Sequence, residues 1–78
     1  MFKVGDILKA NLAEAERQYE GCKGTIVYNA MMKKATEYRF KVLAINPSGY
    51  HLQRVNDGKE NTWSKNEVHN NLVLANDP

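Results

Sequence analysis

Apolar and polar residues alternate through much of the middle of the chain. A period of two is seen in residues 23–30 (KGTIVYNA) and again in residues 37–45 (EYRFKVLAI). Both runs are rich in β-branched and aromatic residues, which are typical of strands. The pattern therefore predicts two strands, with Met31 and Met32 in the connection between them.

Two turn sequences follow the second of these predicted strands. Residues 46–49 (NPSG) combine a proline that fixes φ at one corner with a glycine that can take the positive φ after it. Residues 56–58 (NDG) make a second tight turn. Residues 50–55 and 59–63 return as two further strands, so the sequence predicts a three-stranded meander.

The alternation also predicts which side chains face the core, provided that Gly49 forms a bulge. Arg39 and Lys41 then point to the outer face. Leu43 and Ile45 share that outer face, so we expect this end of the strand to be covered by the chain itself or by a partner. The residues expected to face the core are Phe40, Val42, Ala44, Tyr50 and Leu52.

Helical signals are fewer. Ser64 and Glu67 have the spacing of a capping box and predict a single helical turn, after which residues 72–74 form a closing strand. Residues 11–20 are compatible with a short helix or an ordered loop, and the sequence leaves both open. We therefore expect a mainly β fold of five to six strands with one short helical turn, and a single domain over residues 1–78.

Composition and charge narrow the class of protein. The chain has 78 residues, 42% of them hydrophobic and 26% charged, and no run of about 20 apolar residues that would span a membrane. Cys22 is the single cysteine, so no disulfide framework is expected and a cytoplasmic location is favoured. Cations are concentrated between residues 21 and 55, where Glu37 is the one acid, and this indicates a basic surface on one side.

Two glycine-containing motifs carry a resemblance to a known family. Val4-Gly5-Asp6 opens the first predicted strand, and Gly21, Gly24 and Val27 have a G-x-x-G-x-x-V spacing. Together with the meander, the short helical turn and the final strand, these motifs resemble the KOW-type members of the small SH3-like barrels. The segment of residues 11–20 is longer and more acidic than a plain KOW loop.

The resemblance implies a small SH3-like barrel that binds RNA, DNA, ribosomes or RNA polymerase. The short, asparagine-rich chain also looks like a bacteriophage accessory protein that binds and redirects a host factor, which would place it in the host cytoplasm.

Catalytic and metal-binding patterns are weak. Ser48 lies in a predicted turn, and Ser64 is explained as a helix cap. Cys22, His51 and His69 lack the paired spacing of a structural zinc site. We therefore expect a non-enzymatic protein without a metal or other cofactor.

Two binding hypotheses remain. In the first, basic side chains contact the phosphates of DNA or RNA in transcription or translation. Its residues are Lys23, Lys33, Lys34, Arg39, Lys41 and Arg54. In the second, a phage-type module binds a host protein such as RNA polymerase or a defence protein. Its residues are Met31, Met32, Leu43 and Ile45.

The remaining expectations concern the strand edges and the aromatic rings. Exposed strand edges also allow a homodimer. For the rings of Tyr28, Tyr38 and Trp63 we expect packing rather than base stacking, with Trp63 filling the core.

Overall fold

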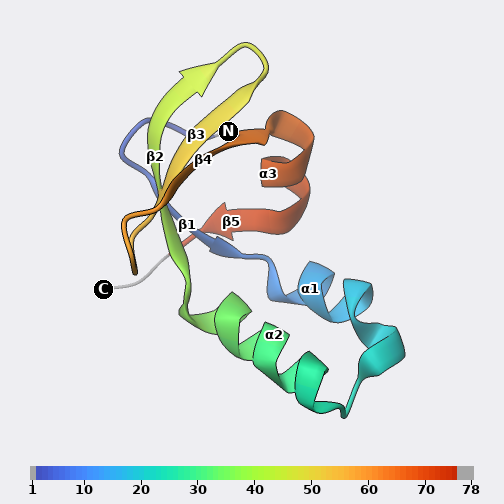
Figure 1. The fold of residues 1–78 in the computed structure, drawn as a ribbon. Helices are drawn as coiled ribbons and strands as arrows, with labels where there is room; N and C mark the ends of the chain where they lie inside the picture. The colour runs from blue at the N-terminus through green and yellow to red at the C-terminus, as the bar shows by residue number, and fades with distance from the viewer. Residues whose placement is uncertain (1, 76–78) are drawn as a thin grey trace.

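The computed structural model of the protein describes residues 2–75 (Figure 1). Its strands are β1 (Ile7–Ala10), β2 (Arg39–Asn46), β3 (Gly49–Arg54), β4 (Glu60–Ser64) and β5 (Leu72–Leu74). Its helices are α1 (Leu12–Gln18), the 3₁₀ turn η1 (Glu20–Cys22), α2 (Ile26–Glu37) and α3 (Lys65–Asn71). The strands form one antiparallel sheet in the order β4-β3-β2-β1-β5.

The predicted meander of β2, β3 and β4 and the closing strand β5 are confirmed, but the closed barrel is not formed. Within residues 2–75, β4 and β5 are the two edges of an open sheet. Helices of 7, 12 and 7 residues accompany strands of 4, 8, 6, 5 and 3 residues. The fold is therefore mixed α/β rather than mainly β.

The register of β2 differs from the prediction in one respect. The irregularity lies in β2 between Val42 and Ala44, not at Gly49. Directly opposed residues of an antiparallel pair share a face, so Ala44, opposite His51, lies on the outer face, and the prediction that it faces the core is wrong. Ile45 lies opposite Tyr50 and is on the inner face, so the prediction that it points outward is wrong.

The predicted strand over residues 23–30 is also wrong, because this segment enters α2. The Thr25 hydroxyl accepts a hydrogen bond from the Tyr28 amide at 3.1 Å and caps the helix. One side of α2 then carries half-buried side chains at helical spacing, namely Tyr28, Met31, Met32 and Ala35. Met31 and Met32 therefore lie inside a helix, and the residues before them do not form a strand.

The two shorter helices begin at capping residues. The side chain of Asn11 accepts a hydrogen bond from the Glu14 amide, and α1 follows, so the undecided segment is helical. Ser64 and Glu67 form the predicted capping box, with both hydrogen bonds at 3.2 Å. α3 runs for seven residues, which is about two turns. It is longer than the single turn predicted.

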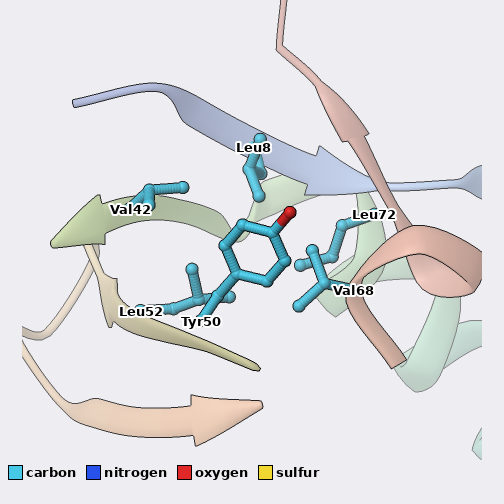
Figure 2. Packing of buried hydrophobic residues seen from close by; sticks show 6 residues of the cluster. All are labelled: Leu8, Val42, Tyr50, Leu52, Val68 and Leu72. Carbon is cyan, nitrogen blue, oxygen red and sulfur yellow. The ribbon is translucent and has the colours of Figure 1, made fainter. Parts of the chain in front are cut away.

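The core lies between the inner face of the sheet and α3. Its buried residues are Leu8, Val42, Tyr50, Leu52, Val68 and Leu72. Figure 2 shows the ring of Tyr50 among the other five side chains. The Tyr50 hydroxyl lies 2.9 Å from Nε2 of His69, which satisfies this buried polar group. Tyr50 therefore fills the position that we expected of Trp63, which is half-buried against the cluster.

Residues 12–37 form a helical insertion between the paired strands β1 and β2. None of the residues in α1, η1 or α2 is buried. Figure 1 shows α1 and α2 beyond one end of the sheet, while the β2–β3 turn lies at the other end. The Gln18 amide donates to Asn71 Oδ1 at 2.9 Å, and the Asn56 amide donates to the Glu37 carbonyl at 3.3 Å. These bonds fix the helical insertion to α3 and to the β3–β4 turn.

Candidate functional site

A hollow of about 310 Å³ lies between the helical insertion and the inner face of the sheet. Tyr19 and Met31 line it from the insertion, and Phe40 and Trp63 line it from β2 and β4. Asn71 and Leu72 close it on the side of α3 and β5, and Tyr38 lines it between α2 and β2.

A second hollow of about 270 Å³ continues along the sheet over β3 and β4. Tyr38, Phe40 and Trp63 line both hollows. We call the two hollows together the aromatic groove. Because these three rings are half-buried, each keeps part of its surface open to a ligand.

The strand register explains why the rings gather. Phe40 lies opposite Arg54, and Trp63 lies opposite Tyr50, so both rings are on the inner face of the meander. Their centroids are 5.3 Å apart at an interplanar angle of 63°, an edge-to-face contact. Both rings pack against the core cluster and are only partly buried by it, so each also lines the two hollows.

Three cations line the aromatic groove. Lys34 of α2 lines the first hollow, and Arg54 and Lys59 line the second. Within residues 2–75, the ammonium groups of Lys34 and Lys59 make no hydrogen bond or ion pair, although the charge of Lys59 helps to lower the pKa of Asp57. Among the described residues that line either hollow, none is acidic. The aromatic groove is therefore an apolar surface with a positive rim.

Arg54 is held in place more firmly than the two lysines. Its guanidinium lies 4.6 Å from the centroid of the Tyr38 ring and makes two hydrogen bonds, of 2.9 and 2.5 Å, to the carboxylate of Asp57. These bonds lower the pKa of Asp57 from 3.8 to about 2 and raise the pKa of Arg54 above its usual value. The guanidinium thus covers one face of Tyr38 and leaves less of that ring open to a ligand.

The structure does not bring the six predicted phosphate ligands to one surface. Lys34 and Arg54 line the aromatic groove, whereas Lys33 is exposed elsewhere on α2. Lys41 is exposed on the outer face of the sheet, with Arg39 two residues before it. The Arg39 guanidinium donates to the carbonyls of Thr36 and Tyr38, at the end of α2. Lys23 lies in a separate hollow with Glu16 and Glu20.

The four residues of the protein-binding hypothesis are also separated. Met31 lines the aromatic groove, and Met32 is half-buried on α2. Leu43 and Ile45 lie toward the opposite end of β2 from α2, half-buried and exposed respectively.

Sequence reasoning missed several residues of the aromatic groove. Lys59 was not among the predicted ligands, and Trp63 was assigned to the core. Tyr38 and Phe40 are two residues apart, as residues on one face of a strand are, and this spacing was the available signal. Tyr19, Gln18 and Asn71 carried no such signal, because only the placement of the helical insertion brings them to the aromatic groove.

Other polar clusters in the described part of the chain are small. His51 bridges Thr62 and Glu60 on the outer face, at 3.1 and 2.8 Å. No group of three or more histidine, cysteine or acidic side chains within residues 2–75 is arranged to hold a metal ion. In the same part of the chain, no helix combines the length and the apolar character needed to cross a membrane.

Comparisons of the chain with models of protein families, with curated proteins and with solved structures give no match. The aromatic groove is the feature of the molecule on which the proposed function is based.

Proposed function

We propose that the protein is a non-enzymatic module that binds single-stranded nucleic acid in its aromatic groove. The observation that carries this proposal is the combination of three half-buried rings that line both hollows with the cations Lys34 and Lys59 beside them. Proteins that bind single strands combine stacking surfaces for the bases with cations that follow the backbone.

The two components have different energetic roles. Base stacking on an aromatic side chain contributes about 1–3 kcal/mol per base and does not depend strongly on sequence. Phosphate contacts by Lys34, Lys59 and Arg54 supply a salt-dependent contribution through the release of counterions. A single strand suits the aromatic groove better than a duplex, because the rings lie inside hollows and stacking requires unpaired bases.

We further propose that the sheet is an open variant of the KOW-type, SH3-like fold, with the helical insertion between its first two strands. The strand order, with β1 between β2 and β5, and the short α3 before β5 support this assignment. A role in transcription or translation in the cytoplasm follows from this resemblance.

A phage-type module that binds a host protein is the second candidate function. One specific observation favours it: the first turn of α2 exposes Ile26 to 88% and Val27 to 63%. Two adjacent, exposed β-branched side chains at the start of α2 are an apolar surface that a protein partner would cover.

The test of the first proposal is the salt dependence of binding to a labelled single-stranded oligonucleotide. Three phosphate contacts predict a log–log slope of about −2.1, at roughly −0.7 per contact. Lys34→Ala should reduce the slope to about −1.4. Lys33→Ala is the matched control, because Lys33 is the neighbouring residue and does not line the aromatic groove; its slope should equal that of the wild type.

If the two lysine substitutions change the salt slope equally, the nucleic acid does not bind in the aromatic groove. Failure of the folded protein to bind any single strand at low salt would contradict the nucleic-acid proposal and favour the protein-binding one.

A further inference from the structure

We propose that the hollow beside the helical insertion receives one unpaired nucleobase and that Gln18 and Asn71 read its hydrogen-bonding edge. This inference rests on the proposed function and adds base selectivity to it. Stacking and phosphate contacts tolerate any sequence, so selectivity requires polar groups that face a base edge.

Gln18 and Asn71 form a fixed amide pair on the wall of this hollow. The Gln18 amide nitrogen donates to Asn71 Oδ1 at 2.9 Å and to Glu14 Oε1 at 3.3 Å. The backbone carbonyl of Asn71 accepts from the Asn11 amide at 2.8 Å, which holds this end of α3 against β1. Glu14 is in turn fixed by its ion pair with Arg17. Both amide groups are therefore oriented before any ligand binds.

The hydrogen bonds that hold the pair leave one acceptor and one donor of the two amide groups unused. Gln18 Oε1 is an acceptor, and Asn71 Nδ2 is a donor, and within residues 2–75 neither atom has a hydrogen-bond partner. One acceptor and one donor are the two groups with which an amide binds a base edge in a bidentate manner. The pair thus acts as one amide-like recognition group contributed by two helices.

The shape of the hollow fits a flat, partly polar group. Ala10, Ala15 and Ala35 line it, and their short side chains leave room between the helical insertion and the sheet. Its volume of about 310 Å³ is at the lower end of the range typical of small-ligand pockets. Phe40 and Trp63 line its sheet side, where a base can stack.

A nucleobase suits this hollow better than an apolar side chain of a protein partner. An apolar group would cover Gln18 Oε1 and Asn71 Nδ2 without replacing their hydrogen bonds to water, which is unfavourable. Lys34 lines the same hollow and can contact the phosphate attached to the bound nucleotide. The polar and charged groups therefore point to the same class of ligand.

The experiment measures the affinities of the wild-type protein for homopolymers of deoxyadenylate, deoxycytidylate and deoxythymidylate and of uridylate, by fluorescence anisotropy. The wild type should bind the best homopolymer at least about fivefold more tightly than the poorest. Gln18→Ala and Asn71→Ala should each reduce that ratio below about twofold by weakening the best homopolymer, since one bidentate contact is lost. The salt slope should not change.

Two further variants distinguish a loss of base selectivity from a loss of stability. Asn70→Ala is the matched control, because Asn70 is an exposed neighbour on α3 that does not line the hollow. Gln18→Met keeps the length of the side chain and should lose selectivity as Gln18→Ala does. Thermal unfolding of each variant measures any change in stability separately.

Retained binding without a base preference, or a preference that both Gln18 substitutions leave intact, would overturn this inference while the proposed function stands. Failure to bind any homopolymer would overturn both.

Discussion

Gly49 shows how a single residue determines the packing of two strands. A Cβ atom at this position would lie 2.0 Å from the backbone carbonyl oxygen of Trp63 and 3.2 Å from Cα of Ser64. Its φ is not positive, so the expectation that this turn needs a left-handed glycine is wrong; among the described residues, Gly5, Gly24 and Gly58 have positive φ. Glycine is required here because β4 lies too close for any side chain.

Gly49→Ala should therefore destabilise the fold by about 1–3 kcal/mol, the usual cost of forcing an extra methyl group into a packed region. Because the clash is with backbone atoms, β4 must move, and the aromatic groove should lose affinity as Trp63 shifts. Gly21→Ala is the matched control, since a Cβ there meets nothing within 4 Å. Urea unfolding monitored by circular dichroism compares the two, and equal stabilities would contradict the close approach.

Asp57 is a second residue with a measurable individual effect. Its pKa is about 2 in the folded protein against 3.8 as the ordinary value, because Arg54 donates to the carboxylate. A lowered folded pKa stabilises the fold above pH 3.8, and this contribution is lost as the pH falls from 3.8 through 2. Glu14, whose pKa is lowered by Arg17, adds to the same acid dependence.

Asp57→Asn should remove that contribution, so the decrease in stability between pH 3.8 and 2 should be smaller in the variant than in the wild type. Thermal unfolding in a pH series from 2 to 6 measures the difference. Parallel curves for the two proteins would show that the Arg54–Asp57 pair is not formed in solution.

At the scale of elements, the helical insertion is a separate unit joined to the sheet. It contributes no buried residue, and the ends that it joins are adjacent, because Lys9 lies directly opposite Arg39. The strands β1 and β2 could thus be joined by a tight turn. The helical insertion forms one wall of the aromatic groove and adds no residue to the core.

Replacing residues 11–37 with the two-residue turn Asn-Gly should leave the five-stranded sheet folded but less stable, because such turns join adjacent antiparallel strands. The variant should lose binding to single strands, because Met31, Lys34 and the rest of one wall are gone. Backbone amide chemical shifts from NMR follow the sheet and anisotropy follows binding. A variant that does not fold would show that the insertion is part of the folding unit.

The elements differed in how far the sequence predicted them. The meander was predictable because its alternation coincides with turn sequences that fix both ends. α2 was mistaken for a strand because residues 25–30 satisfy both periods, and its helical stripe becomes clear only when Met31, Met32 and Ala35 are included. The Thr25 cap and the positive φ of Gly24 before it mark the true start.

At the scale of the whole molecule, the site forms where the helical insertion meets the sheet. The sequence identified Lys34 and Arg54 as candidate ligands by their charge, but it identified Lys33 and Lys41 in the same way. Which of these side chains line the aromatic groove depends on the placement of α2 against the sheet. It also could not bring Gln18 to Asn71, which are 53 residues apart. The aromatic groove is a tertiary feature: the sequence indicates some of the residues that form it, but only the folded chain shows that they meet.

The measurement that tests this account most directly is a fluorescence titration of Trp63, the single tryptophan of the chain, with a single-stranded oligonucleotide at low salt. Because Trp63 lines both hollows, we expect saturable quenching of its emission as bases stack in the aromatic groove. The quenching should be weaker as salt is added and in Lys34→Ala. An oligonucleotide that binds, as shown by its anisotropy, while the emission of Trp63 stays constant would contradict the account.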